Sequence, residues 1–86
     1  MASAEFFDKF KGFLAELDPG LDLGGLTPDT HLWEKGYLDS FAMLGVAAFI
    51  EDETGREVAL NPDTLPDFFT IERMYSAYIA PNEVAR

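Results

Sequence analysis

Large apolar side chains recur at helical spacing in three segments of the chain, and no segment shows the alternation of a half-buried strand over a useful length. The first segment runs from Ser3, a candidate helix cap, to Leu17. Asp18-Pro19-Gly20 follows it and is typical of a helix end. The residues that share one helical face are Phe6, Phe10, Phe13, Leu14 and Leu17. This pattern predicts an all-α fold whose first helix spans residues 3–17.

The second segment is apolar on nearly all sides. We expect this helix to begin at Asp39 or Ser40 and to reach about Thr54, with Gly55 as its C-cap. A helix this apolar is usually buried on more than one side. One stripe consists of Met43, Val46, Ala47 and Ile50, and the other of Phe41, Leu44 and Ala48, turning acidic at Asp52. Only one stripe is needed for the core, so the other is available as a docking surface.

The third segment predicts a helix near the end of the chain, with Thr70 as its cap and Pro81 as its end. Short helical turns are expected before it, from Pro62 to Phe68, because Pro66 limits their length. The tail to Arg86 is expected to fray. The residues of the apolar face are Ile71, Met74, Tyr75, Tyr78 and Ile79. The sequence therefore predicts three main helices plus a short third helix.

A long connection, from Asp18 to Asp39, joins the first two helices. A connection of this length is unusual in a compact domain. Within it, Thr27-Pro28-Asp29 is a candidate for a single helical turn. Its apolar residues are Leu21, Leu23, Leu26, Leu32, Trp33 and Leu38. We therefore expect the connection to pack against the helices.

Charge limits the choice of partners. The chain has a net charge of −10, from 16 acidic and 6 basic residues. Its length of 86 residues predicts a single domain over 1–86. Such a charge argues against nucleic acid and anionic membranes and favours basic protein partners. The alternative is that the acids only keep the domain in solution. No apolar run suits a signal peptide or a membrane span, so we expect a cytoplasmic monomer.

The chain has few residues suited to catalysis. It contains no cysteine, which excludes disulfides and thiol nucleophiles, and its one histidine is His31 in the long connection. Ser40 lies in neither a GxSxG nor an SxxK motif. Gly24-Gly25 lacks the lysine of a phosphate loop, and the adjacent acids Glu51, Asp52 and Glu53 lack calcium-loop spacing. We therefore expect that the chain is not an enzyme and has no metal site.

The Asp39-Ser40 pair has two interpretations. Both residues are common helix caps, and in the first interpretation this structural role is their only one. Alternatively, another enzyme modifies the Ser40 hydroxyl. A helix N-terminus would stabilise a phosphodiester there, since it carries partial positive charge and free N–H groups. Asp39 would then cap the helix or help to hold a metal ion that the modifying enzyme brings.

Three motifs occur in order along the chain: Gly36-x-x-Asp39-Ser40-Phe41, Ile50-Glu51-Asp52-Glu53 and Gly55-x-x-Val58. With the apolar helix between the first two, they resemble the acyl and peptidyl carrier proteins of fatty acid, polyketide and nonribosomal peptide synthesis. The resemblance covers nearly the whole chain, including the long first loop and the short third helix. It implies a carrier with the family's four-helix bundle. We expect a stand-alone carrier, and the alternative is a module excised from a larger synthase.

The resemblance also implies a prosthetic group and partners. In this family the serine that matches Ser40 receives a 4′-phosphopantetheine arm from coenzyme A, and Asp39 precedes it. The thiol of the arm holds an acyl or aminoacyl group as a thioester. Partners would be a phosphopantetheinyl transferase, a loading enzyme and later biosynthetic enzymes. The positions that match the docking surface of the family are Phe41, Leu44, Ala48, Glu51, Asp52 and Glu53.

Two departures from the family pattern bear on the pathway. Phe41 stands where most of the family has leucine. The resulting Leu-Asp-Ser-Phe sequence is similar to that of discrete carriers of specialised pathways, and to that of D-alanyl carriers of cell-wall modification. Gly45 stands where many fatty-acid carriers have an acid, which argues against housekeeping fatty acid synthesis. The first loop also lacks the Gly-Gly-x-Ser signature of peptidyl carriers. These features favour an acyl carrier of a polyketide-type pathway.

Two alternatives remain. One is a stand-alone peptidyl or aminoacyl carrier, of nonribosomal peptide or D-alanyl type, loaded by an adenylation enzyme. The other lies outside the family and is a helical interaction module without a prosthetic group. In that case Asp39 and Ser40 only cap the helix, and the acidic stripe only binds a partner.

Overall fold

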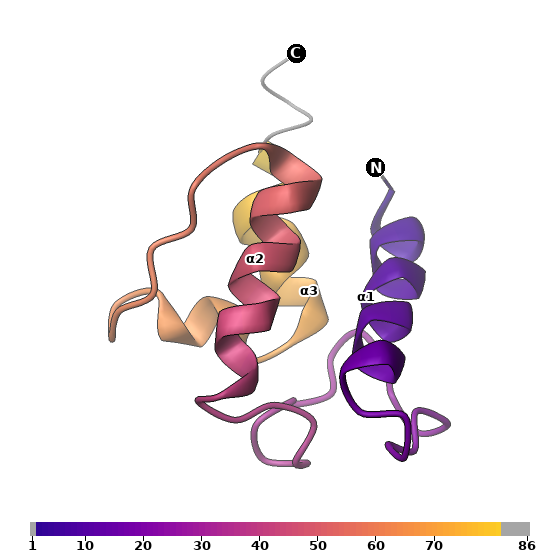
Figure 1. Ribbon diagram of the computed structural model, residues 1–86. Helices are drawn as coiled ribbons and strands as arrows, with labels where there is room; N and C mark the ends of the chain where they lie inside the picture. Colours follow the sequence, from indigo (N-terminus) through magenta and orange to yellow (C-terminus); the bar gives the residue numbers. More distant parts are fainter. Residues whose placement is uncertain (1, 82–86) are drawn as a thin grey trace.

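The computed structural model describes residues 2–81, and Figure 1 shows how their helices are arranged. The three α-helices are α1 (Ser3–Leu17), α2 (Ala42–Thr54) and α3 (Ile71–Met74). A 3-10 helix, η1 (Leu65–Phe68), precedes α3, and a π-helical segment, η2 (Tyr75–Ile79), continues it. Residues 2–81 contain no strand, so the predicted all-α class is confirmed.

The helix α1 buries the face that its spacing predicted, except at its end. Phe6, Phe10 and Leu14 are completely buried. Phe13 is half-buried and packs against the core. Leu17 is 44% exposed and is not part of the core. The predicted cap was also wrong by one residue. Ala2 occupies the N-cap position, and its carbonyl accepts the N–H of Phe6 at 3.0 Å. Ser3 is therefore the first residue of the helix and not its cap.

The helix α2 supplies one wall of the core through the predicted stripe of Met43, Val46, Ala47 and Ile50, all buried. Gly55 ends the helix as predicted. Its φ of 71° is in the left-handed region that favours glycine, and its N–H donates to the carbonyl of Glu51 at 2.7 Å.

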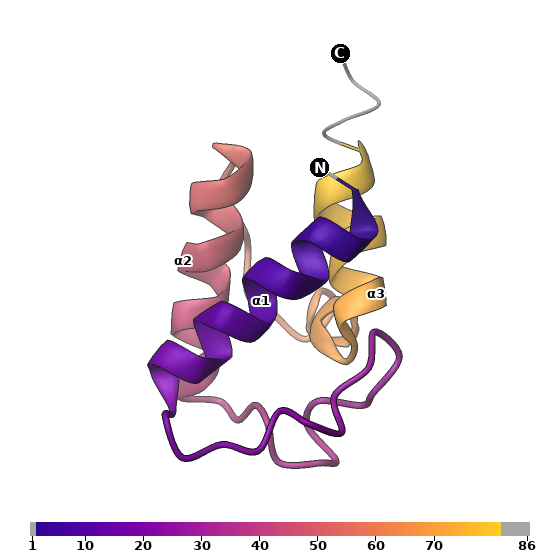
Figure 2. The same ribbon diagram turned by 90° about the vertical axis from the view of Figure 1, so that its right-hand side faces the viewer.

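The helix α1 crosses diagonally over α2 and α3, as the second view shows (Figure 2). Aromatic rings fill these contacts. The ring of Phe49 on α2 stacks on Phe13 with 5.0 Å between centroids and forms a T-shaped pair with Phe10 at 5.8 Å. On the other side, Phe6 packs against Tyr75 of η2 at 6.1 Å. Because aromatic pairs contribute beyond their buried area, α1 stabilises the arrangement of the other two helices.

The predicted last helix is present, but its backbone changes from α to π geometry after Met74. The predicted cap is confirmed, since Oγ1 of Thr70 accepts the N–H of Arg73 at 3.0 Å. In η2, Tyr78 stacks on Phe68 at 5.3 Å and donates a hydrogen bond to Asp67 at 3.3 Å. Burial, together with the Asp67 carboxylate, raises the pKa of Tyr78. Pro81 is the last described residue, so the predicted tail lies outside the described part.

The long connection packs against the helices, as predicted. Leu26, Leu32 and Leu38 are buried, and the N–H of Leu32 donates to the carbonyl of Phe69 at 2.7 Å. The expected turn at Thr27-Pro28-Asp29 is present. It is closed by a hydrogen bond that the N–H of Thr30 donates to the carbonyl of Thr27 at 3.1 Å.

A second turn in the connection was not predicted. It covers residues 31–36, and in it the N–H of Lys35 donates a hydrogen bond to the carbonyl of His31 at 3.0 Å. Gly36 ends it with a φ of 82°. This turn directs the chain back toward the start of α2 and places Trp33 beside that helix.

Candidate functional site at the start of the second helix

Asp39 caps α2. The N–H of Ala42 donates to Oδ1 of Asp39 at 2.8 Å, and the N–H of Met43 donates to the Asp39 carbonyl at 3.1 Å. Regular helix begins at Ala42, later than the predicted start at Asp39 or Ser40, but these bonds belong to the turn that leads into it. Asp39 therefore does the capping that the sequence left open between two residues.

The hydroxyl of Ser40 is free of that structural role. The residue is exposed, and its side chain makes no hydrogen bond to any residue within 2–81. The backbone N–H groups of Ser40 and Phe41 likewise have no acceptor in the described part of the chain, as is usual for the first turn of a helix. An exposed hydroxyl without a partner in residues 2–81 therefore lies beside two unused donors.

A groove of about 320 Å³, with Ser40 in its lining, lies between the start of α2 and residues 60–65. Its lining is mostly apolar, with polar groups from Ser40 and Asn61. The lining residues are Trp33, Ser40, Met43, Leu60, Asn61, Pro62 and Leu65. A larger groove of about 450 Å³ lies between α1 and α3 and does not include Ser40. The smaller groove is therefore the one that bears on the chemistry of this serine.

Trp33 is a residue of this groove that the sequence identified only as a packing residue. Its Nε1 is buried and has no hydrogen-bond partner within the described part of the chain. A buried indole N–H normally has a partner. The sequence carries no signal for this position, because it depends on the turn that ends at Gly36.

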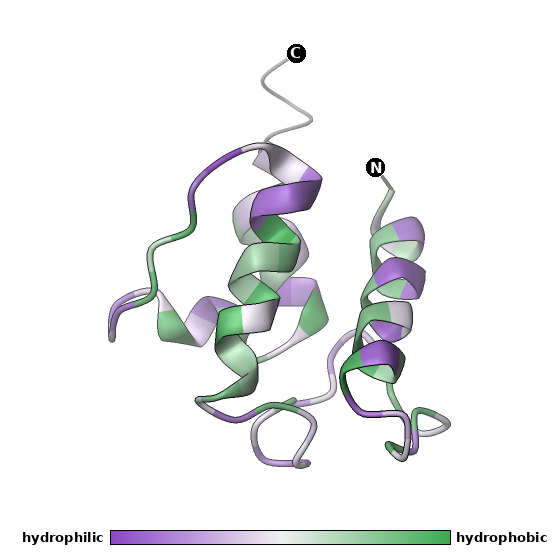
Figure 3. Ribbon diagram, viewed as in Figure 1, coloured by the Kyte–Doolittle hydropathy of each residue, from purple (hydrophilic) through white to green (hydrophobic). Residues whose placement is uncertain are grey.

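The second stripe of α2 faces solvent, as predicted. Phe41 is 83% exposed and Leu44 is 68% exposed, and Ala48 and Asp52 are also exposed. Figure 3 shows the helix changing from hydrophobic residues to hydrophilic ones toward its end. Large side chains this exposed are candidates for contact with a partner.

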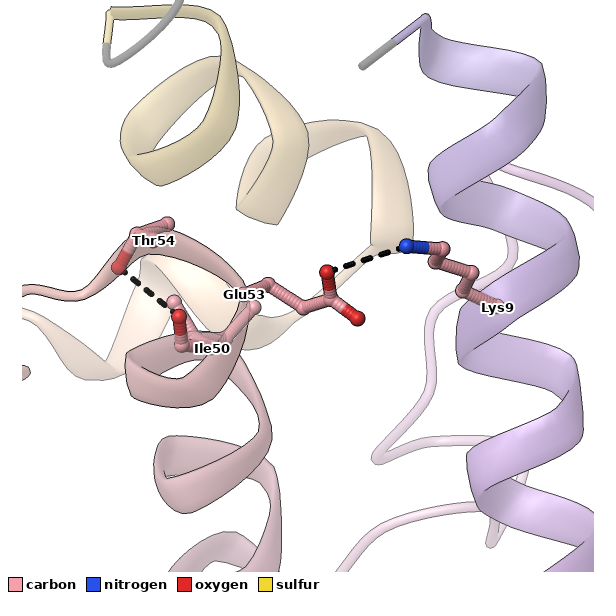
Figure 4. A network of polar contacts seen from close by, with 4 residues as sticks. All are labelled: Lys9, Ile50, Glu53 and Thr54. Atoms are coloured by element: carbon pink, nitrogen blue, oxygen red, sulfur yellow. Dashed lines mark hydrogen bonds and ion pairs between the residues drawn. The ribbon is translucent and has the colours of Figure 1, made fainter.

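The three acids at the end of α2 are not equivalent. Oε2 of Glu51 accepts the N–H of Val58 at 2.8 Å, which fixes the turn after the helix. Glu53 pairs with Lys9 of α1 at 3.3 Å, and Figure 4 shows these two side chains pointing toward each other. Asp52 is exposed and has no polar partner within residues 2–81. Of the three acids, Asp52 is therefore the one that is entirely free to contact a partner.

Gly45 lies where α1 comes close to α2. A Cβ at this position would lie 3.3 Å from the Phe13 ring and 4.0 Å from Cδ1 of Leu17. The former distance is tighter than ordinary van der Waals contact. The glycine therefore has a packing role, in addition to the absence of a charge noted from the sequence.

The other candidates for chemistry have local partners. His31 pairs with Glu34 at 3.4 Å and packs on the Phe69 ring, and it makes no hydrogen bond to Ser40. Within the described chain, no group of three or more histidines, cysteines and acids is arranged to hold a metal ion.

None of the helices in residues 2–81 has the length and apolar character needed to cross a membrane.

Comparisons with known protein families, with curated proteins and with solved structures found no match for this chain. Its function is therefore inferred from its own residues and their geometry.

Proposed function

We propose that this protein is an acyl carrier protein that holds its cargo on a 4′-phosphopantetheine arm attached to Ser40, for partner enzymes of a polyketide-type or related pathway. One observation carries the proposal. Asp39 caps α2, which leaves the neighbouring Ser40 hydroxyl exposed and without a partner in residues 2–81. A serine needed only as a cap would be expected to use its hydroxyl for that bond.

The residues at the start of α2 suit a phosphodiester. Oγ of Ser40 would form the new bond to phosphorus as the pyrophosphate bond of coenzyme A breaks. The nucleotide part would then leave, and the transferase would take the hydroxyl proton. The N–H groups of Ser40 and Phe41 and the positive end of the helix would stabilise the phosphate charge. When bound, the arm supplies the thiol that a chain without cysteine lacks.

The exposed stripe of α2 would be the docking surface for the transferase, the loading enzyme and later enzymes. It combines apolar side chains at Phe41, Leu44 and Ala48 with the free carboxylate of Asp52. Partners with a basic rim around an apolar patch would suit it, since charge complementarity mainly raises association rates. Glu51 and Glu53 would contribute charge while keeping their internal bonds.

The four-helix bundle of the carrier family is part of the proposal. It is supported by η1, which stands between α2 and α3 where the family has its short third helix. The cargo class is also proposed. An aminoacyl or peptidyl cargo would use the same serine and the same arm.

A helical interaction module is a second candidate, favoured by the exposure of Phe41 and Leu44. In that case the stripe would bind a partner, and Ser40 would remain unmodified. The two candidates differ in a single measurement. The protein is incubated with coenzyme A, magnesium and a broad-specificity phosphopantetheinyl transferase, and its intact mass is recorded. A gain of one phosphopantetheinyl group supports the carrier, and an unchanged mass of the folded protein supports the module.

A further inference from the structure

We propose that the indole N–H of Trp33 donates a hydrogen bond to an amide carbonyl of the arm attached at Ser40, and so positions the arm along the groove. The inference rests on the proposed function. It assigns to one side chain a role that the resemblance does not supply.

The first argument is the unpaired donor. Nε1 of Trp33 is buried without a partner in residues 2–81. Leaving a buried N–H unpaired is destabilising, because the group loses its hydrogen bond to water without replacing it. Such a group needs an explanation, and a bound acceptor is one of the few available.

The second argument is location. Trp33 and Ser40 line the same groove of about 320 Å³, so a chain attached at Ser40 meets the indole without leaving the groove. The other walls are apolar, from Met43, Leu60 and Leu65. An arm of short apolar spacers between amide groups suits an apolar groove with a few fixed donors.

Asn61 offers a second donor in this groove. Its Oδ1 already accepts the N–H groups of Asp63 and Thr64, at 2.9 and 3.1 Å. Its Nδ2 is therefore the part of the amide left to face a ligand. The groove thus has apolar walls and the side-chain N–H donor of Asn61. The donor of Trp33, another lining residue, is covered in the unloaded protein. A ligand whose polar groups include carbonyl acceptors matches these two donors.

The groove wall must open slightly for this contact, because Nε1 is covered. The part of the wall around Asn61 is held by hydrogen bonds within its own segment. Oγ1 of Thr64 donates to the carbonyl of Ala59 at 2.7 Å and accepts the N–H of Asn61 at 3.1 Å. This segment is also exposed, with Leu60 at 40%. Contact with the arm would require a shift of this exposed segment, whose turn these local bonds hold together. Loading should therefore change the surroundings of the whole indole.

The test uses the fact that Trp33 is the one tryptophan of the chain, so its indole N–H gives a single assigned resonance. The ¹⁵N-labelled protein is loaded with the arm alone, loading is verified by mass, and the indole resonance is compared before and after. We expect a downfield shift of the indole proton on loading. Ser40→Ala treated with the same reagents is the control and should show neither the mass gain nor the shift.

A second measurement does not depend on that resonance. Trp33→Phe keeps an aromatic ring and removes the donor. Once loading of both proteins is verified by mass, loading should raise the melting temperature of the wild type more than that of this variant.

The outcomes separate the two proposals. A loaded protein with an unchanged indole resonance overturns the role of Trp33 and leaves the carrier function standing. A shift that requires cargo on the arm also overturns it, because the arm itself would not be the acceptor. A folded protein that does not become loaded overturns both.

Discussion

The backbone N–H of Ala42 donates a 2.8 Å hydrogen bond to Oδ1 of Asp39, across the exposed Ser40 that lies between them. This bond assigns the capping role to the aspartate. The hydroxyl of the next residue is then available for chemistry, and the two roles can be separated by mutation.

Asp39→Ala should lower the free energy of unfolding by about 1 kcal/mol, because it removes the cap. Asp39→Asn is the matched control and should retain most of the stability, since asparagine caps about as well. Ser40→Ala should change stability by less than about 0.5 kcal/mol, as expected for a surface residue without a partner. Urea unfolding measures all three. An equal loss for Ser40→Ala and Asp39→Ala would show that the cap is shared.

Two glycines within helices should respond differently to alanine. Gly12→Ala in α1 should stabilise the protein by about 1 kcal/mol, since a Cβ there meets nothing within 4 Å. Gly45→Ala should gain less, or destabilise, because its Cβ would lie 3.3 Å from the Phe13 ring. That ring is held by stacking on Phe49, so it has little room to move. Equal gains in urea unfolding would contradict a packing role for Gly45.

Mutations in the two stripes of α2 should have different effects, since one stripe lies in the core and the other is exposed. Leu44→Ala should leave the free energy of unfolding nearly unchanged and lower kcat/KM for loading by the transferase, because the side chain is 68% exposed. Met43→Ala should cost about 2–5 kcal/mol, because it leaves a cavity in the core. If Leu44→Ala is loaded at the wild-type rate, this stripe is not the surface that the transferase uses.

Charge reversal at Asp52 should slow loading at low salt. The expected loss of kcat/KM is severalfold and should shrink as salt is added, because an exposed charge is screened. Asp8→Lys on α1 makes the same change of net charge at another exposed acid and is the control. An equal effect of both variants would indicate that only total charge matters, and no specific contact of Asp52.

Periodicity predicted the helices well because burial follows the repeat of the helix. It identified the core of α2, from Met43 to Ile50. The preferences of residue types for helix ends, and not the repeat, identified the caps at Gly55 and Thr70. Periodicity failed for Leu17, which is apolar and in register and comes near Gly45 of α2, but is still 44% exposed. The repeat defines a face, but it does not say how far a neighbouring helix covers that face.

The site was only partly predictable. The sequence indicated Asp39 and Ser40, but both are good caps, and the hydrogen bond to Ala42 was needed to tell them apart. It grouped Glu51, Asp52 and Glu53 as docking acids, although two of them bind groups of the chain itself. The unpaired N–H of Trp33 depends on tertiary packing and leaves no pattern in the sequence.

The most direct test of the central claim is intact mass, before and after incubation with coenzyme A, magnesium and a phosphopantetheinyl transferase. Wild type and Ser76→Ala should each gain one phosphopantetheinyl group, and Ser40→Ala should gain none; Ser3 is the remaining serine. Folding of each variant is verified by circular dichroism. A gain that persists in Ser40→Ala would show that another residue carries the arm. No gain in folded wild type would contradict the carrier function and leave the interaction module as the better account.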